Sequence, residues 1–237
     1  MSQDADNLYI ARTKAVAGCF SMFLLMFGLT FTPLFFPASQ DLLAKGLLFP
    51  LLFALEFVVL VPLYYFFFRK REGLGKGIFN ARWFTILFAA LLFIQLILPL
   101  ILGLRQTEAW VTSQISLSSY ALWLSTLTLI FIAPVYEEIV FRGCLFNAFQ
   151  YWFNNKTWLS SVVVSVIFAI MHTQYVDLRH TQYVDLRTLL MLFLVSQVLI
   201  IARLKSNGLL MPIMLHIVMN GTVIALQMGA QTLLPDS

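Results

Sequence analysis

The stretch FTILFAALLFIQLILPLILGL (residues 84–104) carries no charged side chain in 21 consecutive positions. A helix needs about 20 mostly apolar residues to cross the ~30 Å hydrocarbon layer of a bilayer. Soluble domains rarely contain such a run, because about 25% of their residues are charged. We therefore interpret Arg82–Leu104 as a transmembrane helix.

The composition of the whole chain extends this interpretation. Of 237 residues, 60% are hydrophobic and 11% are charged, and the mean hydropathy is +0.87. The further predicted spans are Ala15–Phe36, Gly46–Phe68, about Ser118–Phe153 with Pro134 inside it, a segment from Trp158, about Thr188–Ala202, and about Gly208–Met228. The ten-residue alternation of barrel strands is absent. The sequence predicts an all-α polytopic membrane bundle of about seven transmembrane helices. We expect one transmembrane domain over 1–237, with a motif-bearing core at about 118–228.

The distribution of Lys and Arg predicts the orientation, because these residues accumulate in cytoplasmic loops. With the N-terminus inside, 11 of the 15 basic residues lie on the inner side and 4 on the outer side. The inner group is Arg12, Lys14, Arg69, Lys70, Arg71, Lys76, Arg82, Arg142, Lys156, Arg203 and Lys205; the outer group is Lys45, Arg105, Arg179 and Arg187. We expect a cytoplasmic N-terminus. No basic stripe with interleaved aromatic residues indicates a nucleic-acid partner.

The two cysteines, Cys19 and Cys144, lie far apart in the sequence and form no Cys-x-x-Cys motif. Such spacing indicates neither a disulfide framework nor a metal knuckle. We expect neither from these residues.

Charged residues inside the fourth predicted span are the first candidates for function. The segment PVYEEIVFRGC (134–144) contains Glu137, Glu138 and Arg142. An ionisable residue at mid-bilayer costs at least ~2.5–3.5 kcal/mol on insertion scales and is a functional-site hypothesis by default. Glu138 and Arg142 are spaced i, i+4 on a helix and can pair. Glu137 lies about 100° around the helix from Glu138, so it can face a different partner.

Polar residues on two later spans fall at a similar depth. His172 ends the run VVVSVIFAIMH, and His216 and Asn220 are stacked at i, i+4 in MLHIVMNG. At ~1.5 Å per residue, Glu137 is about 24 Å from Phe153 and His172 about 21 Å from Trp158. By the same rise, Asn220 and His216 are about 18 and 12 Å from Gly208. These four side chains are therefore expected to share one site within the bilayer.

Three motif blocks in order carry a resemblance to a known family: Glu137-Glu138-x-x-x-Arg142, Phe168-x-x-x-His172 and His216-x-x-x-Asn220. They resemble the blocks of the CPBP family, which comprises CAAX prenyl endopeptidases and bacteriocin-processing or immunity proteins, also called the Abi family of intramembrane glutamic proteases. The resemblance covers roughly residues 134–221.

The resemblance implies hydrolysis of a peptide bond inside the membrane by a water that glutamate activates, without a metal or other cofactor. Glu137 resembles the general base, and His172 helps to hold and polarise the water. His216 and Asn220 resemble the donors to the tetrahedral oxyanion, and Glu138 and Arg142 resemble an orienting pair. The implied partners are the lipid bilayer and a peptide or membrane-protein substrate, with or without a prenyl group. The expected location is the plasma (inner) membrane of a prokaryote.

Three other functions remain open. Carboxylates and imidazoles also bind zinc, although His-Glu-x-x-His is absent. Some members of this family act without proteolysis, which leaves a non-catalytic scaffold or immunity protein as an alternative. A transporter that uses Glu and His as a proton relay is the third, but the paired broken helices typical of such repeats are not seen.

Two features lie outside the motif blocks. HTQYVDLR occurs twice in tandem, at 172–179 and 180–187. Phe168 stands four residues before His172, whereas Val176 stands four before His180, so His172 is the expected site residue. If the segment is helical, His180 is also about 12 Å further out. Glu56 is a buried acid in the second predicted span; we interpret it as structural or neutral, with a place in the cavity wall as the alternative.

Overall fold

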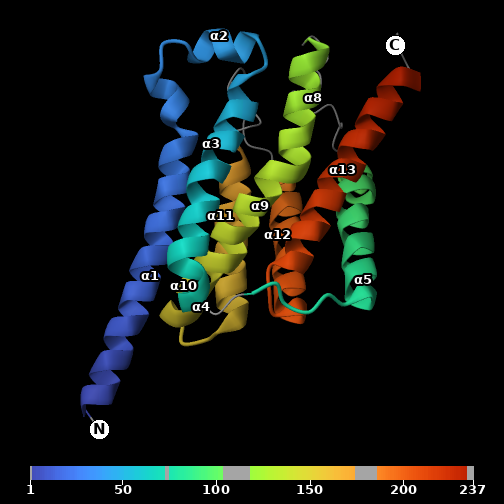
Figure 1. The fold of residues 1–237 in the computed structure, drawn as a ribbon. Coiled ribbons are helices and arrows are strands. Elements are labelled where there is room, and N and C mark those ends of the chain that lie inside the picture. The colour runs from blue at the N-terminus through green and yellow to red at the C-terminus, as the bar shows by residue number, and fades with distance from the viewer. Residues whose placement is uncertain (1, 73–74, 104–117, 174–185, 234–237) are drawn as a thin grey trace.

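The computed structural model describes residues 2–72, 75–103, 118–173 and 186–233, and within these ranges the regular elements are all helices (Figure 1). The predicted all-α class is confirmed. Five helical segments are long and apolar enough to cross a membrane: Arg12–Thr30, Leu48–Phe68, Ala81–Ile101, Ser119–Trp152 and Leu186–Ser206. Two shorter apolar segments, Thr157–His172 and Leu210–Leu226, complete the predicted set. The chain is a multi-pass membrane protein with a helical bundle.

The first span ends earlier than predicted. Helix α1 (Ser2–Thr30) stops at Thr30 instead of running to Phe36, and a short 3-10 turn, η1 (Thr32–Phe35), follows it. Pro33 explains the stop, because proline has no N–H to continue a helical hydrogen-bond ladder. Helix α2 (Ser39–Ala44) then leads over to the second span. The second span comprises α3 (Leu48–Leu63), the π-helical turn η2 (Tyr64–Phe68) and α4 (Arg69–Glu72).

The third and later spans complete the bundle. The third contains α5 (Ala81–Leu92), η3 (Phe93–Ile97) and α6 (Leu98–Ile101). Helices α11 (Thr157–Thr173), α12 (Leu186–Ser206) and α13 (Leu210–Leu233) form the last three. The start of α1 and the end of α13 lie at opposite ends of the bundle (Figure 1), in agreement with the seven predicted spans. The cytoplasmic location of the N-terminus stays a prediction from the loop charges.

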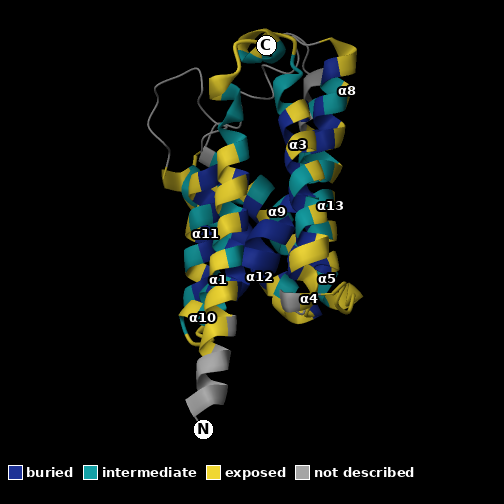
Figure 2. Cartoon of the chain, turned by 60° about the vertical axis from the view of Figure 1, so that its left-hand side comes forward, coloured by how far each residue is buried: buried dark blue, intermediate teal, exposed yellow. Residues whose placement is uncertain are grey.

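The fourth span is an interrupted helix at the centre of the molecule. It runs through α8 (Ser119–Leu127), η4 (Thr128–Ile132), α9 (Ala133–Glu138), η5 (Ile139–Leu145) and α10 (Phe146–Trp152). The turns η4 and η5 are π-helical, a geometry that is rare and frequent at functional sites. Figure 2 shows the buried residues gathered around α9, where α3 and α13 pack against it.

Two apolar clusters form the core. The larger joins Met22 and Met26 of α1 to Phe141, Leu145 and further residues of η5, α10 and α11. The second lies between α5, α12 and α13 and includes Leu91, Leu199 and Met211. Because lipid tails are as apolar as leucine, such helix contacts depend on close packing and interhelical hydrogen bonds.

The expectation that the cysteines form no disulfide is wrong. Cys19 of α1 and Cys144 of η5 form a disulfide across 125 residues of sequence. Both side chains are fully buried where α1 packs on η5. Sequence spacing could not predict this pairing, because only the packing of two helices brings the thiols together.

Candidate active site

The predicted pairing of Glu138 with Arg142 is confirmed. Arg142 Nη1 donates to Glu138 Oε1 over 3.0 Å, one helical turn apart, and both side chains are 0% exposed. Burying two charges costs several kcal/mol per ion unless further hydrogen bonds satisfy them. The structure supplies further bonds to each partner, from Arg142 to Ser196 and from His216 to Glu138. Glu138 Oε2 and Arg142 Nε have no hydrogen-bond partner among the described residues.

Arg142 is held by α12 and α11 as well as by Glu138. Its Nη2 donates to Ser196 Oγ over 3.0 Å, and its guanidinium carbon lies 4.5 Å from the centre of the Phe168 ring. Ser165 of α11 donates to the same Ser196 hydroxyl over 2.9 Å. These contacts tie η5, α11 and α12 together around one buried cation.

His216 of α13 bridges the two adjacent glutamates. Its Nδ1 lies 2.8 Å from Glu138 Oε1, and its Nε2 lies 3.8 Å from Glu137 Oε2. Because a carboxylate only accepts hydrogen bonds, Nδ1 carries the hydrogen of the Glu138 contact. Glu138 therefore orients both Arg142 and His216, which the sequence reasoning had not linked.

Glu137 faces away from this pair, as its position on the helix predicted. Its Oε2 lies 3.7 Å from His172 Nε2 of α11, and its side chain is 15% exposed. His172 Nδ1 lies 2.8 Å from the Phe168 carbonyl oxygen, which can only accept. The hydrogen of the neutral ring is then on Nδ1, and Nε2 presents a lone pair towards Glu137.

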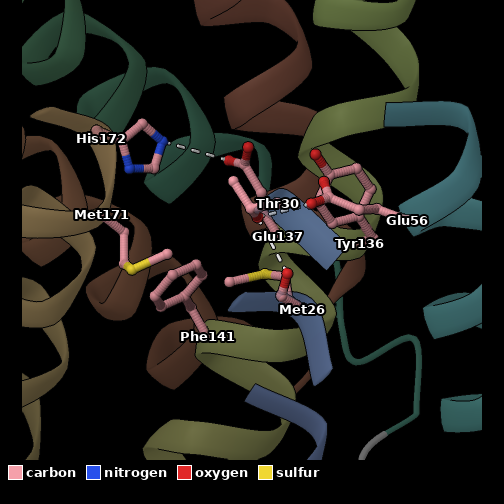
Figure 3. Close-up of a pocket in the computed structure, with 8 residues that line it drawn as sticks. All are labelled: Met26, Thr30, Glu56, Tyr136, Glu137, Phe141, Met171 and His172. Carbon is pink, nitrogen blue, oxygen red and sulfur yellow. Dashed lines mark hydrogen bonds and ion pairs between the residues drawn. The ribbon is translucent and has the colours of Figure 1, made fainter. Parts of the chain in front are cut away.

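A small cavity opens beside Glu137 (Figure 3). It is lined by Met26, Thr30, Glu56, Tyr136, Glu137, Phe141, Met171 and His172. About 20 Å³ is accessible to the centre of a water-sized sphere, and ~10–15 Å³ suffices for one water molecule. The cavity can therefore accommodate about one water in contact with Glu137 and His172.

Asn220 lies one turn beyond His216 on α13, and its Nδ2 donates to the Leu129 carbonyl of η4 over 3.0 Å. Pro134 explains why that carbonyl is available. In the π-helical register, where Ala133 N–H donates to Thr128 O, the partner of Leu129 is residue 134, and proline has no N–H. The bond uses one of the two amide hydrogens of Asn220. The structure gives Asn220 no contact with Glu137.

The structure thus brings Glu137, His172 and His216 together from three helices, and places Glu138 and Arg142 directly behind them. His180 and residues 174–185 of the tandem lie outside the described residues, so the choice of His172 over His180 is supported only by the position of His172. The catalytic roles of these residues stay predictions.

Comparisons with known proteins bear on the motif-bearing half of the chain. The matching family is described as "Type II CAAX prenyl endopeptidase Rce1-like". Residues 118–222 match this family. The match confirms the resemblance that the three motif blocks carry. An Escherichia coli protein described as "Uncharacterized 24.3 kDa protein" is 37% identical over 106 residues, which cover 45% of this chain and 44% of that protein. The chain thus aligns with less than half of that relative, and no solved structure matches the chain.

The Rce1-like segment contains every motif residue but not the whole cavity wall. Met26, Thr30 and Glu56 come from α1 and α3, before the segment begins. Glu56 was interpreted as structural or neutral, with a place in the cavity wall as the alternative, and the structure places it in that wall. No pattern indicated Thr30. In the described part of the chain, no group of three or more His, Cys, Asp or Glu side chains is arranged to hold a metal ion.

Proposed function

We propose that the chain is an intramembrane glutamic endopeptidase that hydrolyses a peptide bond of a membrane-associated or lipidated protein. The observation that carries this proposal is the position of Glu137, between two imidazoles and beside a cavity with room for about one water. The match of residues 118–222 to a prenyl endopeptidase family supports the same reaction class.

Glu137 is the proposed general base. A water in the cavity donates one hydrogen to Glu137 and the other to the lone pair of His172 Nε2, which orients its oxygen towards the scissile carbonyl. As that oxygen attacks the carbonyl carbon, Glu137 takes the water's proton. A base positioned in this way contributes typically ~10²–10⁴-fold to the rate.

His216 and Asn220 are the proposed donors to the tetrahedral oxyanion. His216 Nδ1 is engaged with Glu138, so His216 donates from Nε2 only when the ring carries both hydrogens. Asn220 has its second amide hydrogen for the same task. Removing one oxyanion donor costs about 10²–10³-fold in kcat in other hydrolases.

The remaining assignments belong to the same proposal. The catalytic core is residues 118–228 within one transmembrane domain over 1–237, and the substrate is a peptide or membrane protein with a prenyl or other lipid anchor. The proposed location is the plasma membrane of a prokaryote, with the N-terminus in the cytoplasm.

The decisive experiment replaces Glu137. Purified protein in detergent should cleave an internally quenched, farnesylated peptide with a CAAX terminus, and Glu137→Gln should lower the rate by at least about 100-fold. Asp41→Asn makes the same chemical change, from carboxylate to amide, on exposed α2, where Asp41 pairs with Lys45, and should leave the rate unchanged. A Glu137→Gln protein that cleaves normally would overturn the mechanism, and wild-type protein that cleaves no peptide would favour the scaffold or immunity alternative.

Chelation tests the zinc alternative. If Glu137 activates water directly, exhaustive chelation leaves the rate unchanged and purified protein contains less than one zinc per chain. Loss of activity on chelation, with recovery on addition of zinc, would favour the metalloprotease.

A further inference from the structure

A second carboxyl group shares the cavity with Glu137. Glu56 of α3 is 1% exposed and lies on the cavity wall with Thr30 and Tyr136, whereas Glu137 points towards His172 on the other side (Figure 3). A buried acid in a membrane span is conspicuous because it is costly when charged and unpaired. The mechanism proposed above does not use this group.

The contacts of Glu56 fit a protonated acid. Thr30 Oγ1 lies 2.8 Å from Glu56 Oε1 and 3.0 Å from the Met26 carbonyl oxygen. A hydroxyl has one hydrogen, and the Met26 carbonyl can only accept, so both contacts are satisfied together when Glu56 donates to Thr30. The Tyr136 side chain forms a further hydrogen bond with Glu56. The partners of Glu56 are thus neutral hydroxyls rather than a cation.

We infer that Glu56 is the general acid that protonates the departing amine. This inference rests on the proposed endopeptidase function. Glu137 takes a proton from water as the carbon–oxygen bond forms. Glu56 gives its proton to the amide nitrogen as the carbon–nitrogen bond breaks. After the products leave, a new water enters the cavity, and Glu137 passes its proton through this water to the Glu56 carboxylate. The sum is the addition of one water to the peptide bond, and both carboxyl groups return to their starting states.

The test uses two substrates that differ in their need for an acid. The first is the quenched farnesylated peptide, and the second is the same molecule with an ester in place of the scissile amide. An amine cannot leave without a proton, whereas an alkoxide leaves far more readily. In Glu56→Gln, kcat for the amide should fall by about 100-fold, the lower end of the range for acid–base catalysis, because protonated Glu137 is a substitute donor. The ester should be cleaved at close to the wild-type rate with an unchanged KM.

Tyr136→Phe is the matched control. It removes a hydrogen bond from the same cluster but leaves the Glu56 proton, so the ratio of amide to ester rates should stay at the wild-type value. Equal losses on both substrates in Glu56→Gln would show that Glu56 only holds α1, α3 and α9 together, and would overturn the inference. An unchanged amide rate would overturn it as well.

Glu56→Asp provides the test if Glu56→Gln does not fold. It keeps an acid but withdraws it by one methylene, so the amide rate should fall more than the ester rate. Equal falls would again overturn the inference. Wild-type protein that cleaves neither substrate would refute the proposed function and this inference together, whereas wild-type cleavage of both isolates the role of Glu56.

Discussion

Glu137 and Glu138 are neighbours in the chain but occupy different surroundings. The Glu137 side chain is 15% exposed, faces a cavity and lies 3.7–3.8 Å from two imidazoles. The Glu138 side chain is 0% exposed and contacts Arg142 and His216 at 3.0 and 2.8 Å. One step of about 100° around a helix separates the two directions. Adjacent carboxylates can thus take different parts, one facing the cavity and the other holding the residues around it.

The largest expected effect is a difference in the free energy of unfolding between Glu138→Gln and Glu137→Gln. Glu138→Gln leaves the Arg142 charge buried without its carboxylate, and removal of one partner of a buried pair costs about 3–5 kcal/mol. Glu137→Gln should change the free energy of unfolding much less, because Glu137 borders a cavity. Unfolding of the purified variants in mixed micelles measures both.

The double variant Glu138→Gln/Arg142→Met is the control for this prediction. It removes both buried charges and should recover part of the loss. A Glu137→Gln protein as unstable as Glu138→Gln would remove the distinction between the two glutamates.

The next prediction sharpens the Glu137 side and uses the tandem repeat as an internal control. His172→Ala should lower peptide cleavage by about 100-fold or more, within the range of acid–base contributions. His180→Ala should keep most of the activity, and deletion of residues 180–187 should be tolerated because His172 keeps its spacing from Phe168. If His180 is essential and His172 is not, the pairing of Glu137 with His172 is wrong.

The smallest expected effects probe the Glu138 side through two serines. Ser196→Ala removes a hydroxyl that accepts from Arg142 Nη2 over 3.0 Å and leaves that donor the Ser196 carbonyl at 3.4 Å. The loss is therefore at most about 1–3 kcal/mol, the cost of a fully unsatisfied buried donor. Ser165→Ala removes contacts between neutral groups, to the Ser196 hydroxyl and from the Gln197 amide, each worth about 0.6 kcal/mol in a membrane helix pair. Equal losses of unfolding free energy for the two serine variants would mean that the Ser196 hydroxyl on α12 does not specifically stabilise the charged Arg142 side chain.

The three motif blocks predicted the motif-bearing half of the site, because that half depends on residue spacing within helices. Glu138 and Arg142 at i, i+4 met as expected. Counting ~1.5 Å per residue placed Glu137, His172, His216 and Asn220 in one band, and the first three lie together in the structure. The contact of Asn220 with Leu129 was not predictable in the same way. It depends on a π-helical register beside Pro134, and a register change moves a carbonyl without changing any apolar pattern.

The contacts made by residues of the first two spans could not be predicted from the sequence. Cys19 and Thr30 carry no motif, and Glu56 was noted without a partner. Their roles come from contacts with Cys144 and with the cavity, and these depend on how α1 and α3 pack against the fourth span. The sequence of a uniformly apolar helix does not indicate which of its faces packs against another helix, because lipid tails and the protein interior are similarly apolar.

By itself, the sequence determined that the chain is a helical membrane protein, because backbone groups in lipid must be satisfied within each span and length and hydropathy report that requirement. It also predicted that the motif residues share a depth, because the rise per residue varies little along a helix. Only the tertiary structure decided which glutamate faces the cavity, which one orients His216 and Arg142, and that Glu56 reaches the same cavity. These features depend on how helices that are far apart in the sequence pack against one another, and helical periodicity carries no information about that packing.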